Sequence, residues 1–293
     1  MRILFVTSSR IGDAVLSTGL LDHLIRTYPQ ARITVACGTA AEGVFSRMPN
    51  LERLIAFDKV MRGLHWLPLW ARVVGHWWDL VVDIRSSALG WLVPARRRVV
   101  MRRGPGHKTV QLAAILGLDP PPLPVAWTSA EDRALAARLL PAGSPVIALG
   151  PTANWDGKVW PPERFVALAR RIAAERLPGA RLAVFAGPGE YEARLAAPVL
   201  AALPEAIDLT GRLALPEAAA CLARCAIFIG NDSGLMHLAA SAGCPTLGLF
   251  GPTPAPEYAP AGRRAGVAVA KGKAMAELAV EDALAAAGAL LAA

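Results

Sequence analysis

Short, uniformly apolar runs alternate with longer amphipathic stretches along almost the whole chain, and this alternation constrains the fold more than any other feature. Strands that are apolar on both faces are typical of parallel sheets with helices covering each face. Two series of strands are expected, at 2–7, 32–36, 53–57, 80–84 and 97–101, and at 146–150, 181–186, 207–209, 226–230 and 246–250. Helices are expected between them, at 14–27, 162–176, 191–202 and 215–225. The pattern therefore predicts an α/β protein.

The series of strands breaks once. Residues 119–124 read Asp-Pro-Pro-Pro-Leu-Pro, which can continue neither a helix nor a central strand. A short helix near 130–140 is expected next, and we place a domain boundary after it, between domains 1–140 and 141–293. Each domain is expected to be a doubly wound, Rossmann-like sheet. Because ligands of such sheets bind beyond the carboxyl ends of the strands, the two parallel sheets are expected to face a central cleft.

Composition limits the partners. Hydrophobic residues make up 54% of the chain and charged residues 18%, which favours filled cores over disorder. The net charge of +8 suits an anionic partner, namely a phosphorylated substrate, a nucleic acid or an anionic membrane. Nucleic acid is the least favoured, because no zinc knuckle, helix-turn-helix or ribonucleoprotein signature is present. No uninterrupted run of about 20 apolar residues is available to span a bilayer, which predicts a soluble or peripheral protein.

The cysteines bear on metal binding and on compartment. The four are Cys37, Cys221, Cys225 and Cys244, and no two of them have CxxC spacing. They predict buried thiols rather than a metal site. They also suit a reducing, cytoplasmic compartment.

The first strand runs into a turn that contains Arg10, Gly12 and Asp13, and a helix is expected from Ala14. Gly12 permits a tight turn or the close approach of a ligand. Asp13 then lies at the mouth of the predicted cleft, where its carboxylate is placed to take a proton from an attacking hydroxyl. The alternative is that Asp13 caps the helix, and the residues alone favour this reading, although the two roles are compatible.

Two loops of the second domain carry charged residues beside glycines. Residues 150–161 form a Gly-containing strand-to-helix loop with Lys158, which suits a phosphate, although a surface loop with a solvated lysine is an equal alternative. It is not a P-loop, because Val159 stands where Ser or Thr is needed. Gly187-Pro188-Gly189 ends the next expected strand, and Glu192 after it is placed to bind ribose hydroxyls or to complement the helix dipole.

The strongest local signal is the run 229–239, in which an apolar strand leads into Asp232, Ser233 and Gly234 and then directly into a helix. The free N–H groups of such a helix start form an anion site, and Gly234 lets a diphosphate approach closely. His237 lies one turn further on the same face. The alternative is an N-cap at Asp232 or Ser233 and a packed histidine.

Taken together, the strand ends that carry Lys158, Glu192 and the 232–234 turn are expected at one edge of one sheet, which suits a nucleoside diphosphate better than three unrelated caps. No Asp-x-Asp pair is present, so the charge of a leaving group would be met by Lys158 and the helix start, without a metal or other cofactor. The basic, Trp-rich stretch 61–108 is expected to form a core of tryptophans with an arginine rim, part of which contacts anionic lipid headgroups.

Three blocks of residues carry a resemblance to a known family. Residues 10–13 (Arg-Ile-Gly-Asp), Lys158 with Trp160-Pro161, and 231–237 followed by 243–253 resemble the ADP-heptose–lipopolysaccharide heptosyltransferases, glycosyltransferase family 9. The resemblance covers nearly the whole chain, and its last block is highly specific. It implies a GT-B fold with an N-terminal acceptor domain and a C-terminal nucleotide-sugar domain. It also implies inverting, metal-independent transfer.

The resemblance further implies roles for individual residues and for partners. Asp13 matches the general base, and Arg10 and Gly12 beside it are acceptor-side candidates. The residues that match the donor site are Thr152, Lys158, Glu192, Asp232, Ser233, Gly234 and His237. The implied partners are an ADP-sugar, an anionic glycolipid acceptor of the lipopolysaccharide core, and the cytoplasmic face of the inner membrane. A nucleotide-sugar epimerase on the same fold and a non-catalytic sugar-nucleotide-binding scaffold are the alternatives.

Overall fold

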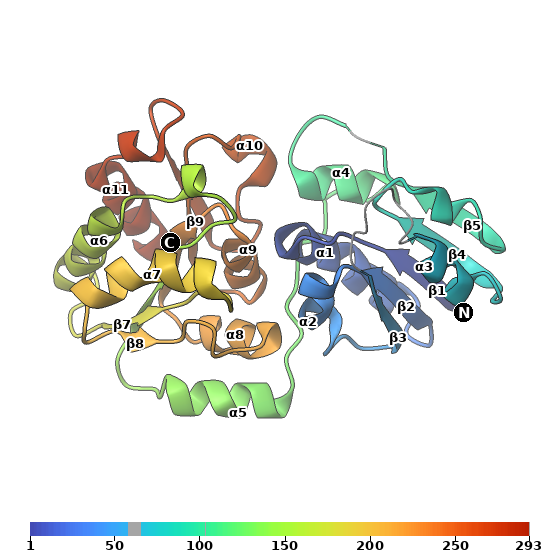
Figure 1. The fold of residues 1–293 in the computed structure, drawn as a ribbon, viewed down its shortest axis with the longest axis horizontal. Helices are drawn as coiled ribbons and strands as arrows, with labels where there is room; N and C mark the ends of the chain where they lie inside the picture. The colour runs from blue at the N-terminus through green and yellow to red at the C-terminus, as the bar shows by residue number, and fades with distance from the viewer. Residues whose placement is uncertain (58–65, 103, 293) are drawn as a thin grey trace. The chain divides into compact units, whose positions relative to one another are not determined.

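The computed structural model describes residues 1–57, 66–102 and 104–292. The chain divides into two compact units, Met1–Trp127 and Thr128–Ala293, and each unit has a parallel sheet of its own (Figure 1). The predicted α/β fold with two doubly wound domains is confirmed.

The N-terminal unit is built on a five-stranded sheet of order β3-β2-β1-β4-β5. Its strands are β1 (Arg2–Val6), β2 (Arg32–Cys37), β3 (Leu51–Ala56), β4 (Trp78–Asp83) and β5 (Ala95–Val100). Its helices are α1 (Ile11–Thr27), α2 (Glu42–Phe45), α3 (Trp66–Val73) and α4 (Lys108–Ala114), with single 3-10 turns at Thr39–Ala41 and Ala88–Gly90. The chain reverses its direction across the sheet between β1 and β4, so the loops after these two strands open at the point where ligands of such sheets bind.

The C-terminal unit is built on a six-stranded parallel sheet of order β11-β10-β9-β6-β7-β8. Its strands are β6 (Val146–Gly150), β7 (Arg181–Val184), β8 (Ile207–Asp208), β9 (Ile227–Asn231), β10 (Thr246–Phe250) and β11 (Ala265–Val269). Its helices are α5 (Ala130–Leu139), α6 (Pro162–Glu175), α7 (Glu190–Ala202), α8 (Leu215–Leu222), α9 (Gly234–Ser241), α10 (Ala255–Tyr258) and α11 (Val280–Ala292), with 3-10 turns at Asp156–Lys158 and Met275–Glu277. In this sheet the chain reverses its direction across the strands between β6 and β9.

Burial explains why these runs are strands. The central strands β1, β6 and β9 are almost wholly buried, because helices cover both faces of each sheet. The core of the C-terminal unit packs apolar side chains of β6, β7, β9 and β10 against those of α6, α7 and α11. The sheets therefore form rigid bases, and the loops at their carboxyl ends are free to carry polar side chains.

The structure corrects three sequence-based expectations. The domain boundary lies between Trp127 and Thr128 rather than after residue 140, because α5 packs against α8 and so belongs to the C-terminal unit. Helix α1 begins at Ile11 rather than at Ala14. Strand β11 was not predicted, since its Ala- and Gly-rich residues, Ala265–Val269, lack the β-branched and aromatic side chains typical of strands.

Candidate functional site

The predicted donor residues gather at the reversal point of the C-terminal sheet. Strands β9, β6 and β7 are neighbours, so the loops after them lie at one edge, as the sequence predicts. Lys158, on the loop after β6, forms an ion pair with Asp232 after β9, with Nζ and Oδ2 2.5 Å apart. The Lys158 side chain is 19% exposed and that of Asp232 is 9% exposed. The pair is therefore largely shielded from water, and Asp232 precedes the first residue of α9, Gly234, by two residues.

Helix α9 begins directly after Asp232, as expected. Ser233 is its N-cap, with extended backbone angles, and its hydroxyl accepts a hydrogen bond from the Met236 N–H at 3.5 Å. Gly234 is the first helical residue, and N–H groups of this first turn are oriented to meet an anion. Two other predicted donor residues, Thr152 after β6 and His237 on α9, are buried.

Glu192 lies on the first turn of α7, at the end of β7. Gly189 precedes this helix with φ of +107°, a conformation that side chains disfavour. The Glu192 carboxylate accepts a hydrogen bond from the Gly187 N–H at 3.2 Å, so its contact in this structure is with its own loop. Asp156 connects this helix to the loop of Lys158, since it accepts a hydrogen bond from the Tyr191 hydroxyl at 2.8 Å.

Asp13 lies within the first turn of α1, at the reversal point of the N-terminal sheet. The N-cap position is Arg10, which makes no side-chain capping bond, so the interpretation of Asp13 as the cap residue was wrong. The backbone turns into the helix at Ile11, which places Asp13 two residues after the start. The Ser8 hydroxyl donates to Asp13 Oδ2 at 3.3 Å and accepts from the Arg10 N–H at 3.2 Å. The half-buried Asp13 carboxylate is thus oriented but remains accessible.

A second carboxylate holds the neighbouring loop. Asp83, at the end of β4, is fully buried and accepts hydrogen bonds from the Arg85 N–H at 2.8 Å, the Ser87 N–H at 2.9 Å and the Ser87 hydroxyl at 2.6 Å. Burial raises the pKa of the Asp83 carboxyl, and these hydrogen bonds partly offset the rise. The Arg85 guanidinium donates to Ser9 Oγ at 3.5 Å, which connects this loop to the one that precedes Asp13.

Comparison with known proteins identifies the family to which the chain belongs. A family model described as glycosyltransferase family 9 (heptosyltransferase) matches residues 94–287. The chain belongs to glycosyltransferase family 9. The match includes Lys158, Glu192, Asp232 and His237, and it ends the choice among general α/β classes.

Individual relatives and solved structures of the same family are similar to this glycosyltransferase over nearly its whole length. Lipooligosaccharide heptosyltransferase 2 of Haemophilus influenzae is 26% identical over 89% of the chain and 86% of the relative. Among solved structures, a glycosyltransferase family 9 protein from Veillonella parvula has a TM-score of 0.83 at 24% identity, covering 99% of this chain and 97% of that one. The structure of E. coli ADP-heptose lps heptosyltransferase II has a TM-score of 0.78 at 22% identity, covering 100% and 99%. These likenesses confirm the GT-B fold.

Asn231 opens the 231–237 block of this glycosyltransferase, but no role was predicted for it from the sequence. Its buried amide accepts a hydrogen bond from the Trp160 N–H at 3.0 Å and donates to the Pro151 carbonyl at 3.0 Å. Both partners belong to the loop that carries Lys158, so Asn231 holds that loop against β9. The available signal was an amide side chain at a strand end, directly before Asp232.

We expect Asn231→Ala to destabilise the C-terminal unit by about 2–4 kcal/mol. The substitution leaves the Trp160 N–H and the Pro151 carbonyl without their partner, and each unsatisfied buried polar group costs about 1–3 kcal/mol. Urea unfolding followed by tryptophan fluorescence measures this loss. Asn154→Ala is the matched control, because Asn154 is an exposed amide in the same loop and should change stability by less than about 0.5 kcal/mol. Equal stabilities of the two variants would contradict the role given to Asn231.

Within residues 1–57, 66–102 and 104–292, no group of three or more His, Cys, Asp or Glu side chains is placed to hold a metal ion. The four cysteines are buried and free, which confirms the prediction of buried thiols. Burial raises the pKa of Cys37 and of Cys225 to about 12, so these thiols stay protonated and unreactive at neutral pH.

Proposed function

We propose that this glycosyltransferase moves a heptose from ADP-heptose to an anionic glycolipid of the lipopolysaccharide-core type. The relative from Haemophilus influenzae is named for heptose transfer in lipooligosaccharide, and the E. coli structure is titled for ADP-heptose. The chain covers 86% of the Haemophilus influenzae relative and 99% of the E. coli structure.

The observation that carries the proposal is the Lys158–Asp232 pair beside the start of α9. A diphosphate at this point would meet the Lys158 ammonium and the N–H groups of the first helical turn, which together offset the charge of a departing nucleoside diphosphate. Asp232 orients the ammonium through the 2.5 Å contact. Thr152 and His237, which lie at the end of β6 and on α9, are the further donor contacts. We assign Glu192 to the ribose of the donor. When the donor binds, hydrogen bonds from the ribose hydroxyls would replace the one that the Glu192 carboxylate accepts from the Gly187 N–H.

The acceptor is assigned to the N-terminal unit. Asp13 would take the proton of the acceptor hydroxyl as that oxygen attacks the anomeric carbon from the face opposite the diphosphate. The C–O bond to the diphosphate breaks as the new glycosidic bond forms, and the configuration inverts. Arg10, which is exposed, and Gly12, which leaves room at the helix start, would contact the acceptor.

The acceptor of such a reaction is held in a membrane. None of the helices in the described part of the chain is long and apolar enough to cross a bilayer. We propose that the protein acts in the cytoplasm and reaches its acceptor by peripheral contact with the inner membrane, toward which its net charge of +8 would attract it.

We expect heptose transfer to a detergent-dispersed core glycolipid to continue unchanged in excess EDTA. The leaving diphosphate is met by Lys158 and the helix start, so no divalent ion is required by the proposal. Mass spectrometry of the donor and of the lipid product measures the transfer, and the anomeric configuration of the product tests inversion. Activity that is lost in EDTA and restored by magnesium or manganese would refute the metal-free mechanism.

The same assay separates the alternatives. Turnover of the donor without any acceptor would identify an epimerase instead. Tight donor binding with no turnover on any glycolipid would identify a binding scaffold. An ADP-heptose control without enzyme corrects for spontaneous hydrolysis of the donor.

A further inference from the structure

Helix α3 exposes an apolar face that the core does not use. Leu69 and Val73 are buried in the core of the N-terminal unit, while Leu67 is 60% exposed and Trp70 is 37% exposed. A surface helix normally turns polar residues outward, so an outward apolar face marks an interaction surface.

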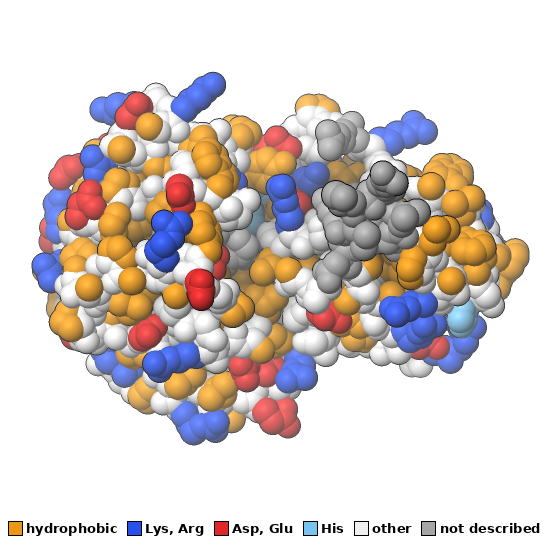
Figure 2. All heavy atoms as spheres, in the orientation of Figure 1, with side chains coloured by type: hydrophobic (Ala, Val, Ile, Leu, Met, Phe, Trp, Pro, Cys, Tyr) orange, Lys and Arg blue, Asp and Glu red, His pale blue; other side chains and the backbone are white. Residues whose placement is uncertain are grey.

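The turn before β5 extends this face. Trp91 is 68% exposed and Leu92 is 62% exposed. The Trp70 indole Nε1 donates to the Leu92 carbonyl at 2.9 Å, which fixes α3 beside the turn. Trp77, 64% exposed, lies directly before β4. We call Leu67, Trp70, Trp77, Trp91 and Leu92 the amino-edge patch, because Trp77 and the chain after Leu92 lead directly into the amino ends of β4 and β5. Figure 2 shows hydrophobic side chains gathered at the end of the unit that carries α3 and β5.

Arg98 holds the turn in place. Its guanidinium donates to the backbone carbonyls of Gly90 at 3.1 Å, Val93 at 2.6 Å and Ala95 at 3.0 Å. Arg98, which lies in the basic stretch 61–108, therefore uses its hydrogen-bond donors within the fold. Trp91 and Leu92 are thus presented on a braced turn, which reduces the entropy lost when they bind.

Arginines surround the amino-edge patch. Within 66–102 the chain has six arginines and only two acidic residues. Asp83 is buried, so within this range only Asp79, which accepts the Arg2 backbone N–H at 2.7 Å, adds negative charge near the surface. Of the arginines, Arg96 and Arg97 on β5 are exposed. Arg62 and Arg103 of the predicted rim lie outside the described residues.

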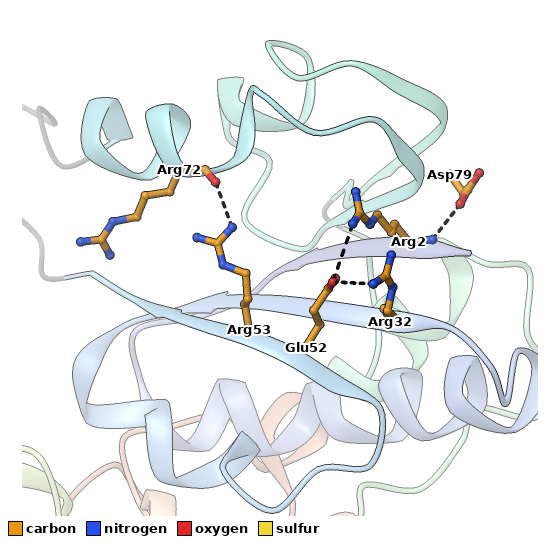
Figure 3. Close-up of polar contacts among 6 residues, drawn as sticks. All are labelled: Arg2, Arg32, Glu52, Arg53, Arg72 and Asp79. Carbon is orange, nitrogen blue, oxygen red and sulfur yellow. Dashed lines mark hydrogen bonds and ion pairs between the residues drawn. The ribbon is translucent and has the colours of Figure 1, made fainter.

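The β3 side of the same edge adds further positive charge (Figure 3). Arg2 and Arg32 share one carboxylate, that of Glu52, at 3.9 Å and 3.3 Å. Arg53 donates to the Arg72 backbone carbonyl at 3.4 Å, a neutral acceptor that leaves the guanidinium charge in place. Positively charged arginine side chains therefore border the amino-edge patch.

We propose that the amino-edge patch docks on an anionic lipid bilayer, with its indole rings and leucines at the level of the headgroups and with Arg53, Arg72 and Arg96 facing the lipid phosphates. Tryptophan and arginine side chains favour this layer, because each combines an apolar body with a polar end. The near absence of free acids favours an anionic surface over a protein of mixed charge. The inference rests on the proposed function, which places the acceptor in a membrane.

The patch is separate from the reaction site of its own unit. Asp13 follows the carboxyl end of β1, whereas Trp77 precedes the amino end of β4, and the two strands are parallel neighbours. Changes in the patch should therefore affect membrane binding and leave Asp13 unaffected.

The test is co-sedimentation with vesicles of phosphatidylcholine containing phosphatidylglycerol. Wild-type protein should bind at low salt, bind less as salt rises, and bind pure phosphatidylcholine poorly. Trp77→Ser/Trp91→Ser should lower the partition coefficient about tenfold or more. Arg72→Gln/Arg96→Gln, at two exposed arginines, should lower it about 25-fold, since each arginine near the surface contributes about fivefold.

Matched controls remove the same chemistry elsewhere. Val110→Ser removes an exposed apolar side chain from α4, and Arg138→Gln/Arg263→Gln removes two exposed charges from the other unit, so both should bind close to wild type. Unchanged melting temperature and unchanged transfer to detergent-dispersed glycolipid show that the patch variants are folded and active. The proposal would be overturned if both patch variants bound vesicles as strongly as the wild-type protein does. It would also be overturned if the patch held two copies of the protein together as a dimer that does not bind vesicles. Failure of transfer by wild-type protein in detergent would instead count against the proposed function.

Discussion

Asp13→Asn is expected to lower turnover by about 10²–10⁴-fold, the range typical of lost general-base catalysis, while the affinity for ADP stays nearly constant. Asparagine has the same shape and keeps an oxygen that accepts the Ser8 hydroxyl, now 3.3 Å from Asp13 Oδ2. The amide does not take up a proton, so the effect falls on the transition state. Steady-state transfer rates and ADP calorimetry on the same preparation measure the two quantities.

Stability separates this role from a structural one. Because Asp13 is inside the first turn rather than at the N-cap, its contribution to the fold is the interaction of a carboxylate with the helix dipole, about 0.3–1 kcal/mol. Asp22→Asn is the matched control, since Asp22 lies on the same helix and pairs with Arg26. It should lose a little stability and no activity. A wild-type rate for Asp13→Asn would assign the residue to the helix alone, and His237 would be the next base to test.

Lys158→Ala is expected to weaken ADP binding by about 1–3 kcal/mol, or roughly 5–150-fold. The structure adds a reason for the upper part of this range. Removing the ammonium leaves the Asp232 carboxylate, 9% exposed, unpaired beside the diphosphate, where it repels the ligand.

The double variant tests that reason. Lys158→Ala/Asp232→Asn lacks both charges, so it should bind ADP more tightly than Lys158→Ala does. Lys271→Ala, at an exposed lysine of the same unit, is the control and should bind as wild type. Calorimetry measures the affinities, and the rise in melting temperature with ADP gives a second measure. Unchanged ADP affinity in Lys158→Ala would remove this lysine from the donor site.

Much of the fold follows from short-range pattern, because a strand buried on both faces must be apolar throughout. Strand β6 was predicted with the bounds it has, 146–150, since Pro145 before it and Pro151 after it mark its ends. Strand β11 was missed because its Ala and Gly residues do not differ from those of a helix or loop. Its pairing with β10, a long-range contact, decides its conformation.

Single residues of the candidate site could be selected from the sequence, but the contacts between their side chains could not. Lys158 and Asp232 could be selected separately, as a lysine in a glycine-containing loop and an acid before a helix. Their contact depends on the order of strands in the sheet, which local pattern does not contain. The positioning roles of Asn231, Asp83 and Arg98 were missed for a related reason, because their partners are mostly backbone groups whose positions only the folded chain defines.

The parallel N-terminal sheet has one further consequence. Strand β4 contributes the six residues Trp78–Asp83, and Asp83 lies in register with Val6 at the end of β1. At about 3.3 Å per residue, the two edges of the sheet are about 20 Å apart. With Trp77 at the lipid surface and Asp13 beyond the opposite edge, the sheet would separate these two residues by about 20 Å along the strands. The enzyme would then favour acceptors whose sugar portion extends across that distance from the bilayer.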